Sequence, residues 1–199
     1  MKCFDCKIIL YISVFVFWER RIAMRLFVAL NFDENIKNAL LADIDSLQKY
    51  SLEGNFTKKD NLHLTIAFIG ETPKINEAKA ALQTVREQSF ALEIAGFGCF
   101  RRRGGDLYWR GVKSNERLLS VYRQVTAALR AKGFVLDDRP FKPHLTLGRQ
   151  VITDSDFDMN SFKKTLLPLK TVITRVSLMK SERIQGKLCY SEVCGVDLH

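Results

Sequence analysis

From Leu26 onward the chain alternates between short apolar runs, which predict β-strands, and amphipathic segments, which predict helices. A strand is expected over residues 26–32, followed by a helix that begins near Asp33 or Glu34 with acidic residues in its first turn. Apolar residues recur at helical spacing along this helix at Ile36, Leu40, Ile44 and Leu47. Gly54 and Asn55 then interrupt the pattern, and the next strand is expected from His63 to Ile69, ending at Gly70.

The same kinds of segment continue to the end of the chain. An amphipathic helix is expected over residues 74–88, a strand over 90–100, and a hairpin tip at the basic, glycine-containing stretch 101–105. A strand starting at Leu107, a helix over 114–132 stopped by Gly133, and a strand starting at His144 follow. Two last strands are expected over residues 171–181 and 187–196, joined by a turn at Gln185–Gly186.

The order of segments contains an internal repeat. Leu26 precedes His63 by 37 residues, and Leu107 precedes His144 by 37 residues, so a strand–helix–strand unit recurs at an offset of 81. His-Leu-Thr stands at the same place in both copies. The repeat predicts an α+β fold of two lobes related by a pseudo-twofold axis, each a mainly antiparallel sheet backed by helices, with a cleft between them.

The repeated His-x-Thr pattern predicts where the polar side chains point. Because side chains alternate along a strand, His63 and Thr65 share one face, and His144 and Thr146 share one face of the other strand. The intervening residues belong to the opposite, core-forming faces: Leu64, Ile66 and Phe68 in the first copy, Leu145 and Leu147 in the second. Each copy therefore presents an imidazole and a hydroxyl to the predicted cleft.

Two imidazoles facing each other suit the cleavage of a phosphodiester. One neutral histidine takes a proton from the nucleophile and one protonated histidine supplies the leaving oxygen, and an ordinary pKa near 6.5 allows both states near neutrality. The two threonine hydroxyls are expected to donate hydrogen bonds to the non-bridging phosphate oxygens, whose charge grows in the transition state. None of these roles requires a metal or another cofactor, and the symmetry of the repeat leaves open which histidine is the acid.

Composition narrows the class of protein. Lysine and arginine outnumber acidic residues 31 to 22, which favours polyanionic partners. The 47% of hydrophobic residues exclude a disordered chain, and only 11 glycines and 4 prolines exclude a low-complexity one. Five cysteines, an odd number, show no disulfide framework, which agrees with a reducing cytoplasm. Cys3 and Cys6 form a C-x-x-C pair, but no second pair or nearby histidine completes a zinc site.

The first 23 residues differ from the rest. Ile8–Trp18 is an apolar run too short to span a bilayer, and no small-x-small cleavage pattern follows it. Met24 directly precedes the first strand of the repeat and is interpreted as the natural start. Residues 1–23 are accordingly expected to be an extension outside a single catalytic domain over residues 24–199, without stable membrane association. A membrane-surface anchor, or an extra element packed on the body, is the alternative.

Three stretches of the chain resemble a known family, the two-histidine (2H) phosphoesterases and, within them, the LigT-like RNA 2′,3′-cyclic phosphodiesterases. They are Met24–Leu30 (MRLFVAL), Asn61–Thr65 (NLHLT) and Arg139–Arg149 (RPFKPHLTLGR), and the resemblance covers about residues 24–198. It implies a bilobal fold with both motifs in a central cleft and metal-independent opening of a terminal 2′,3′-cyclic phosphate to a 2′-phosphomonoester.

The resemblance also assigns roles and partners. It implies that His63 is the proton donor, that His144 is the proton acceptor, and that Thr65 and Thr146 hold the phosphate. The expected partners are RNA with 2′,3′-cyclic phosphate ends or nucleotide 2′,3′-cyclic phosphates, with no metal, in a cytoplasmic monomer. Family members also join tRNA halves through a 2′,5′ linkage, which is the same chemistry with a ribose hydroxyl in place of water.

Other residues near the motifs are candidates for substrate binding. Arg149 could bind phosphate, but strand parity places it on the face opposite His144 unless the strand bulges at Gly148. Phe56 and Phe141 could stack on a base or pack in the core, and Arg101–Arg103 could follow an RNA backbone or be a solvated hairpin tip.

Two alternative functions are also compatible with the sequence. One is cleavage of another diester, such as a 2′,5′-oligonucleotide or a cyclic nucleotide derivative. The other is a non-catalytic RNA- or nucleotide-binding protein that uses its basic surface.

Overall fold

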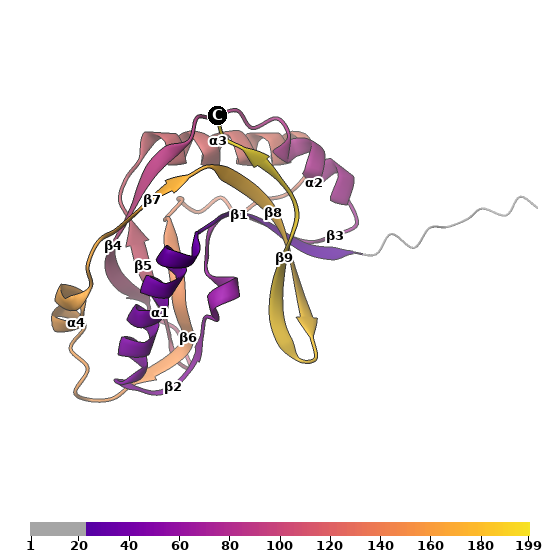
Figure 1. Ribbon diagram of the computed structural model, residues 1–199. Coiled ribbons are helices and arrows are strands. Elements are labelled where there is room, and N and C mark those ends of the chain that lie inside the picture. Colours follow the sequence, from indigo (N-terminus) through magenta and orange to yellow (C-terminus); the bar gives the residue numbers. More distant parts are fainter. Residues whose placement is uncertain (1–22) are drawn as a thin grey trace, which may run out of the picture.

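A computed structural model describes residues 23–199, which form two antiparallel sheets with helices packed against them (Figure 1). The first sheet has the strand order β3-β1-β8-β9. Its strands are β1 (Met24–Asn31), β3 (His63–Thr72), β8 (Arg175–Ile184) and β9 (Lys187–Asp197). The second sheet has the order β2-β6-β5-β4-β7. Its strands are β2 (Ser51–Phe56), β4 (Phe90–Phe100), β5 (Asp106–Val112), β6 (His144–Thr153) and β7 (Leu169–Ile173).

Helices cover one face of each sheet. They are α1 (Glu34–Gln48), α2 (Ile75–Leu82), α3 (Glu116–Ala131) and α4 (Met159–Thr165), with a short 3-10 turn, η1 (Lys59–Asn61), before β3. In Figure 1, α2 and α3 lie along the first sheet, and α1 and α4 lie beside the second. The predicted α+β fold of two helix-backed antiparallel sheets is confirmed.

The internal repeat corresponds to equivalent strand pairs in the two sheets. β1 and β3 pair across the first sheet and are connected through α1, whereas β5 and β6 pair across the second and are connected through α3. The two helices are exchanged between the sheets, since α1 contacts β2, β6 and β7, and α3 contacts β3. Each half of the chain therefore contributes a helix to the other half's sheet.

Local sequence signals account for the two long helices. Asp33 caps α1 by accepting a hydrogen bond from the Ile36 amide at 2.9 Å, and the four residues at helical spacing named above are its buried ones. Asn115 caps α3 in the same way, and Gly133, at φ +78°, follows its end. Both helices were predicted, with starts within two residues of those found.

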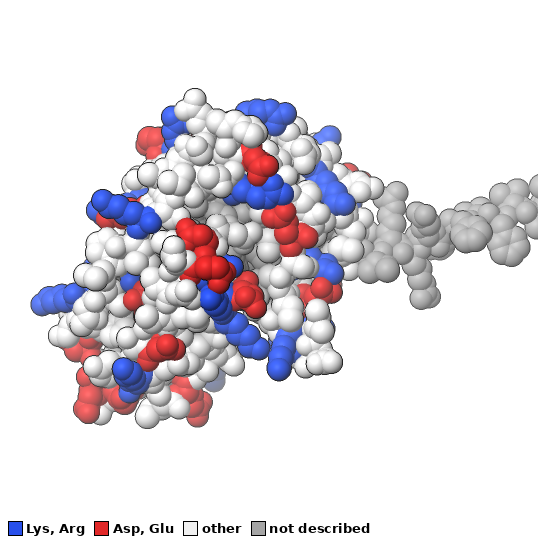
Figure 2. Space-filling model, in the orientation of Figure 1, with Lys and Arg blue, Asp and Glu red and all other residues white. Residues whose placement is uncertain are grey.

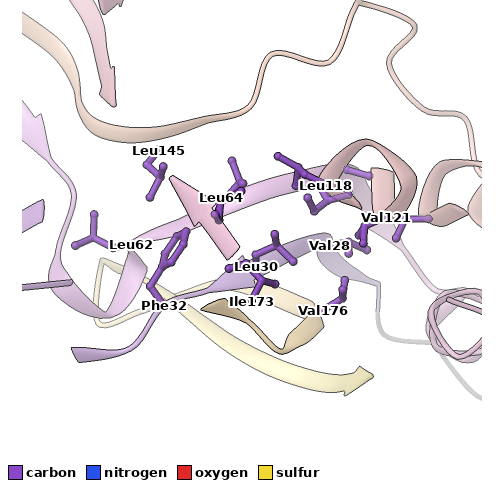
Figure 3. Close-up of a cluster of buried hydrophobic side chains, with 14 of the residues drawn as sticks. Val28, Leu30, Phe32, Leu62, Leu64, Leu118, Val121, Leu145, Ile173 and Val176 are labelled. Atoms are coloured by element: carbon purple, nitrogen blue, oxygen red, sulfur yellow. The ribbon is translucent and has the colours of Figure 1, made fainter. Parts of the chain in front are cut away.

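One buried cluster joins the two sheets, and it includes residues from Leu26 to Leu198. Leu64 of β3 and Leu145 of β6, both 0% exposed, lie in it together (Figure 3). β3 and β6 are in contact, so the strands that begin with the two motif histidines meet across this core.

Three predicted elements differ from the structure. The helix expected over residues 74–88 ends at Leu82, because Arg86 exchanges backbone hydrogen bonds with the Gln124 side chain of α3, 2.8 and 2.9 Å long, instead of continuing the helix. The strand expected over residues 171–181 is two strands, β7 and β8, since the chain crosses between sheets at Thr174. Gly54 and Asn55, interpreted as a break, lie within the edge strand β2, which pairs with β6.

The extension predicted for residues 1–23 lies outside the described residues, apart from Ala23, and so do Cys3 and Cys6. Within residues 23–199 no helix is both long enough and apolar enough to cross a membrane.

Candidate active site

The two motif histidines are the first residues of β3 and β6 and occupy equivalent positions in the two sheets. His63 pairs with Asn31 of β1, and His144 pairs with Gly111 of β5. Both imidazoles are half-buried, as are Thr65 and Thr146, while Leu64, Ile66, Leu145 and Leu147 on the other face are buried in the core. The predicted division of the two faces is therefore found at both motifs.

Both imidazoles are held through the same atom. His63 Nδ1 lies 2.7 Å from the backbone oxygen of Asn61, and His144 Nδ1 lies 2.7 Å from that of Lys142. A carbonyl oxygen only accepts hydrogen bonds, so each Nδ1 carries a proton and donates it. In both rings Nε2 is consequently the nitrogen that gains and loses a proton.

The two rings differ at Nε2. His63 Nε2 lies 2.9 Å from the Thr65 hydroxyl, close enough for the hydroxyl to donate when the ring is neutral and to accept when the ring is protonated. In the described part of the chain no protein atom forms a hydrogen bond with His144 Nε2. His63 therefore has a polar partner for either protonation state, whereas His144 Nε2 is open to a water molecule or a substrate.

Aromatic side chains enclose each imidazole. The ring centroids of Phe27 and Tyr190 lie 4.9 and 5.2 Å from that of His63. Those of Phe100 and Trp109 lie 5.2 and 6.3 Å from that of His144, both edge-on. The sequence reasoning missed these four residues, because they belong to β1, β9, β4 and β5, and only the sheet pairing brings them to the histidines.

The enclosure and the local charge act on the protonation of both rings. Burial lowers the pKa of His63 below its ordinary value; the Asn61 hydrogen bond opposes this, and the positive charges of Arg149 and His144 add to it. Burial likewise lowers the pKa of His144, opposed by the Lys142 hydrogen bond and reinforced by Arg149. Both imidazoles thus favour the neutral state until an anion enters the site.

Arg149 lies near both imidazoles because β6 bulges. Thr146 pairs with Trp109 and Gly148 pairs with Tyr108, so Leu147 is an extra residue and the alternation of faces shifts by one. Arg149 is exposed, and no carboxylate within ion-pair distance accompanies it in residues 23–199. Strand alternation brings Arg149 to the face of His144 only if β6 bulges next to Gly148. The extra residue at Leu147 meets this condition.

A similar irregularity corrects the prediction for Phe68. Thr65 pairs with Ala29 and Ala67 pairs with Val28, which makes Ile66 an extra residue in β3. Phe68 consequently turns to the face of His63 and Thr65, where it is 59% exposed. The expectation that Phe68 lies in the core was wrong, and no local sequence signal marks the bulge.

The other aromatic candidates are engaged in packing. The Phe141 ring stacks on Tyr122 of α3, with centroids 4.2 Å apart and planes 8° from parallel. Phe56 lies against the core cluster, with its ring beside Gly54 and Gly148. A role for either ring in stacking on a base stays a prediction.

The basic stretch 101–105 forms the expected hairpin tip between β4 and β5. There Arg101 pairs with Asp106 at 2.5 Å, and Arg102 and Arg103 are exposed. Acidic and basic side chains are intermingled over the face seen in Figure 2, so the excess of positive charge forms no uniform patch on that face. In the described residues no three histidine, cysteine or acidic side chains are grouped so as to hold a metal ion.

Comparison with known proteins places this arrangement in a family. Residues 33–185 match the family model described as the 2′-5′ RNA ligase superfamily. The chain belongs to this superfamily.

Particular relatives agree with the assignment. A protein of Thermotoga maritima named RNA 2′,3′-cyclic phosphodiesterase is 32% identical over 148 residues, which are 67% of this chain and 79% of that protein. One of Archaeoglobus fulgidus with the same name is 33% identical over 63% of this chain and 72% of its own length. The crystal structure of Escherichia coli LigT complexed with 3′-AMP has a TM-score of 0.73 and 22% identity, covering 88% of this chain and 98% of LigT, and shows the same fold.

Proposed function

We propose that this protein is an RNA 2′,3′-cyclic phosphodiesterase, which opens a terminal 2′,3′-cyclic phosphate to a 2′-phosphomonoester. The observation that carries the proposal is the pair of equivalent histidines, each held by an Nδ1–H···O=C hydrogen bond that leaves Nε2 to titrate. Relatives that bear this name at 32–33% identity support the same substrate class.

In the proposed reaction His144 is the base and His63 is the acid. His144 Nε2 takes a proton from a water molecule, whose oxygen attacks phosphorus. The bond between phosphorus and O3′ then breaks, and protonated His63 gives its Nε2 proton to O3′. The products are a 2′-phosphate and a free 3′-hydroxyl. The open Nε2 of His144 agrees with a role next to water, and each proton transfer is expected to contribute about 10²–10⁴-fold to the rate.

The remaining groups of the site stabilise charge on the phosphate. Arg149 has no ion-pair partner in the described part of the chain, and its charge acts on both imidazoles, so a phosphate between them would lie near the guanidinium. Thr65 and Thr146 are expected to donate hydrogen bonds to the non-bridging oxygens. The negative phosphate also raises the pKa of both rings, which counteracts their burial and allows His63 to be protonated in the complex.

The same groups can catalyse RNA ligation. A 5′-hydroxyl of a second RNA would replace water, lose its proton to His144 and form a 2′,5′ phosphodiester while His63 protonates O3′.

The proposed substrates are RNA with 2′,3′-cyclic phosphate ends or nucleotide 2′,3′-cyclic phosphates. The protein is proposed to act as a cytoplasmic monomer and without a metal. We assign catalysis to residues 24–199, because the shared core runs from Leu26 to Leu198.

The deciding experiment incubates an RNA oligonucleotide ending in a 2′,3′-cyclic phosphate with the purified protein in EDTA. We expect the product to gain the mass of one water molecule, to become sensitive to phosphatase and to co-migrate with a synthetic 2′-phosphate standard. An unchanged cyclic end, from protein shown to be folded, would reject the proposal. It would favour another diester, tested with 2′,5′-oligonucleotides, or a binding protein whose RNA affinity does not depend on His63 and His144.

A further inference from the structure

The β8–β9 hairpin continues beyond the first sheet as a two-stranded ribbon. β1 pairs with β8 only as far as Ser181, whereas β8 and β9 remain paired to Ile184 and Lys187. Residues 182–190, here named the ribbon, extend away from the helix-covered part of the sheet at the lower right of Figure 1. Gln185 and Gly186 close it with φ of 49° and 76°, the backbone of a tight two-residue turn.

The ribbon is joined to the first motif histidine through β9. The Asn61 side-chain amide donates a hydrogen bond to the Leu188 carbonyl oxygen at 2.9 Å, while the Asn61 backbone oxygen accepts from His63 Nδ1. The Tyr190 ring lies edge-on to His63 and 5.0 Å from Phe27. The ribbon therefore begins at the reacting phosphate of the proposed function and leads away from it.

The outer part of the ribbon combines free positive charge with apolar surface. Arg183 and Lys187 are exposed, and within residues 23–199 neither has a carboxylate at ion-pair distance. The acidic residue of the ribbon, Glu182, is neutralised by Lys180 at 2.7 Å. Ile184 and Leu188 are exposed beside these cations.

We propose that the Tyr190 face of the ribbon binds the RNA strand on the 5′ side of the terminal nucleotide, with Arg183 contacting its phosphates. The proposal rests on the proposed function, which places the terminal phosphate at His63. Arg183 pairs with Leu188, which lies two residues from Tyr190 and about 7 Å along the strand, so Arg183 shares the Tyr190 face and is placed for an upstream phosphate, not the reacting one. Lys187 and Ile184 lie on the opposite face of the ribbon. Cations beside apolar side chains on an exposed surface are typical of sites that follow a single strand by its backbone and bases.

The test compares two substrates that share the same reacting end: adenosine 2′,3′-cyclic phosphate and a single-stranded RNA that ends in that nucleotide. We expect Arg183→Ala to raise KM for the RNA severalfold at low salt and to leave kcat, and all constants for the mononucleotide, unchanged. The slope of log KM for the RNA against log salt should decrease by about 0.7, because the loss of one phosphate contact to a single strand lowers that slope by about this amount.

Control variants separate this effect from general charge and from folding. Lys163→Ala/Lys164→Ala removes two exposed lysines from α4, beside the other sheet, and should leave the RNA kinetics unchanged. Lys187→Ala removes an equally exposed cation from the opposite face of the ribbon and should also leave the RNA kinetics unchanged. Arg183 also donates to the Gly186 carbonyl oxygen at 3.0 Å, so Arg183→Gln, which removes the charge and keeps a donor, should give the same slope change of about 0.7.

Several outcomes would overturn the proposal. An unchanged KM for the RNA would do so, as would an equal change for both substrates, which would mean that the ribbon acts only through His63. A lower molecular mass of the ribbon variant than of the wild-type protein, measured by light scattering, would identify the ribbon as a contact between copies of the chain. If the wild-type protein hydrolyses neither substrate, the proposed function fails instead, and fluorescence anisotropy of the same labelled RNA then tests the ribbon with the same variants.

Discussion

Asp43 of α1 and Arg110 of β5 form a buried ion pair that joins the two halves of the repeat. The Arg110 side chain is 1% exposed, and it also donates to the Leu167 carbonyl oxygen at 2.7 Å. Replacing Asp43 with Ala leaves this guanidinium without its counter-charge and without access to water. We therefore expect Asp43→Ala to lower the free energy of unfolding by about 3–5 kcal/mol. For a domain of this size, that corresponds to a fall in Tm of roughly 6–20 °C.

Urea unfolding followed by circular dichroism measures the loss directly. Asp43→Leu/Arg110→Met removes both charges and should recover most of the stability, because an apolar pair of similar volume avoids the buried charge. Glu34→Ala, which breaks the exposed pairs with Lys37 and Lys59, should have little effect. A loss below about 1 kcal/mol for Asp43→Ala would refute the reasoning, since it would mean that the guanidinium is hydrated or finds another acceptor.

The same variant separates stability from catalysis. Arg110 pairs with Leu145 on the core face of the second sheet, whereas its neighbour Trp109 pairs with Thr146 on the face of His144. At a temperature where Asp43→Ala is folded, its kcat/KM should equal that of the wild type. A large loss there would show that the ion pair also positions the site.

The other predictions concern the proposed chemistry. His63→Ala and His144→Ala should each lower kcat by about 10²–10⁴-fold with an unchanged circular dichroism spectrum; activity near that of the wild type in either variant would remove that ring from the mechanism. Because both free-enzyme pKa values lie below 6.5, the state with one protonated and one neutral ring is populated in acid, so kcat/KM should be maximal below pH 6.5 and fall as pH rises. Bound phosphate raises both pKa values, so the optimum of kcat should lie at higher pH than that of kcat/KM, and coincident profiles would contradict this. Arg149→Gln should raise KM for the cyclic phosphate and move the kcat/KM optimum upward, because the charge that lowers both pKa values is gone; an unmoved pH profile would place Arg149 outside the site. Extensive dialysis against EDTA should leave kcat unchanged, and recovery of lost activity by an added divalent cation would require a metal in the mechanism.

The features that depend on neighbouring residues could be predicted from the amino-acid sequence. The spacing of Ile36, Leu40, Ile44 and Leu47 defines the buried face of α1, and side-chain caps at Asp33 and Asn115 define where α1 and α3 begin. His63 and His144 were found by a repeat in the sequence, because two equivalent strands carry the same short motif. Helix periodicity, caps and strand alternation act over a few residues, so they can be read locally.

The features that depend on pairing between distant strands are visible only in the folded protein. The bulges at Ile66 and Leu147, which bring Phe68 and Arg149 to the faces of the histidines, arise where one strand has an extra residue against its neighbour. The crossing of the chain at Thr174 divides an unbroken β-type run between two sheets, since each part pairs with a different partner. Register, sheet membership and the exchange of α1 and α3 depend on contacts between residues far apart in the chain, and a single sequence contains no local signal for such contacts.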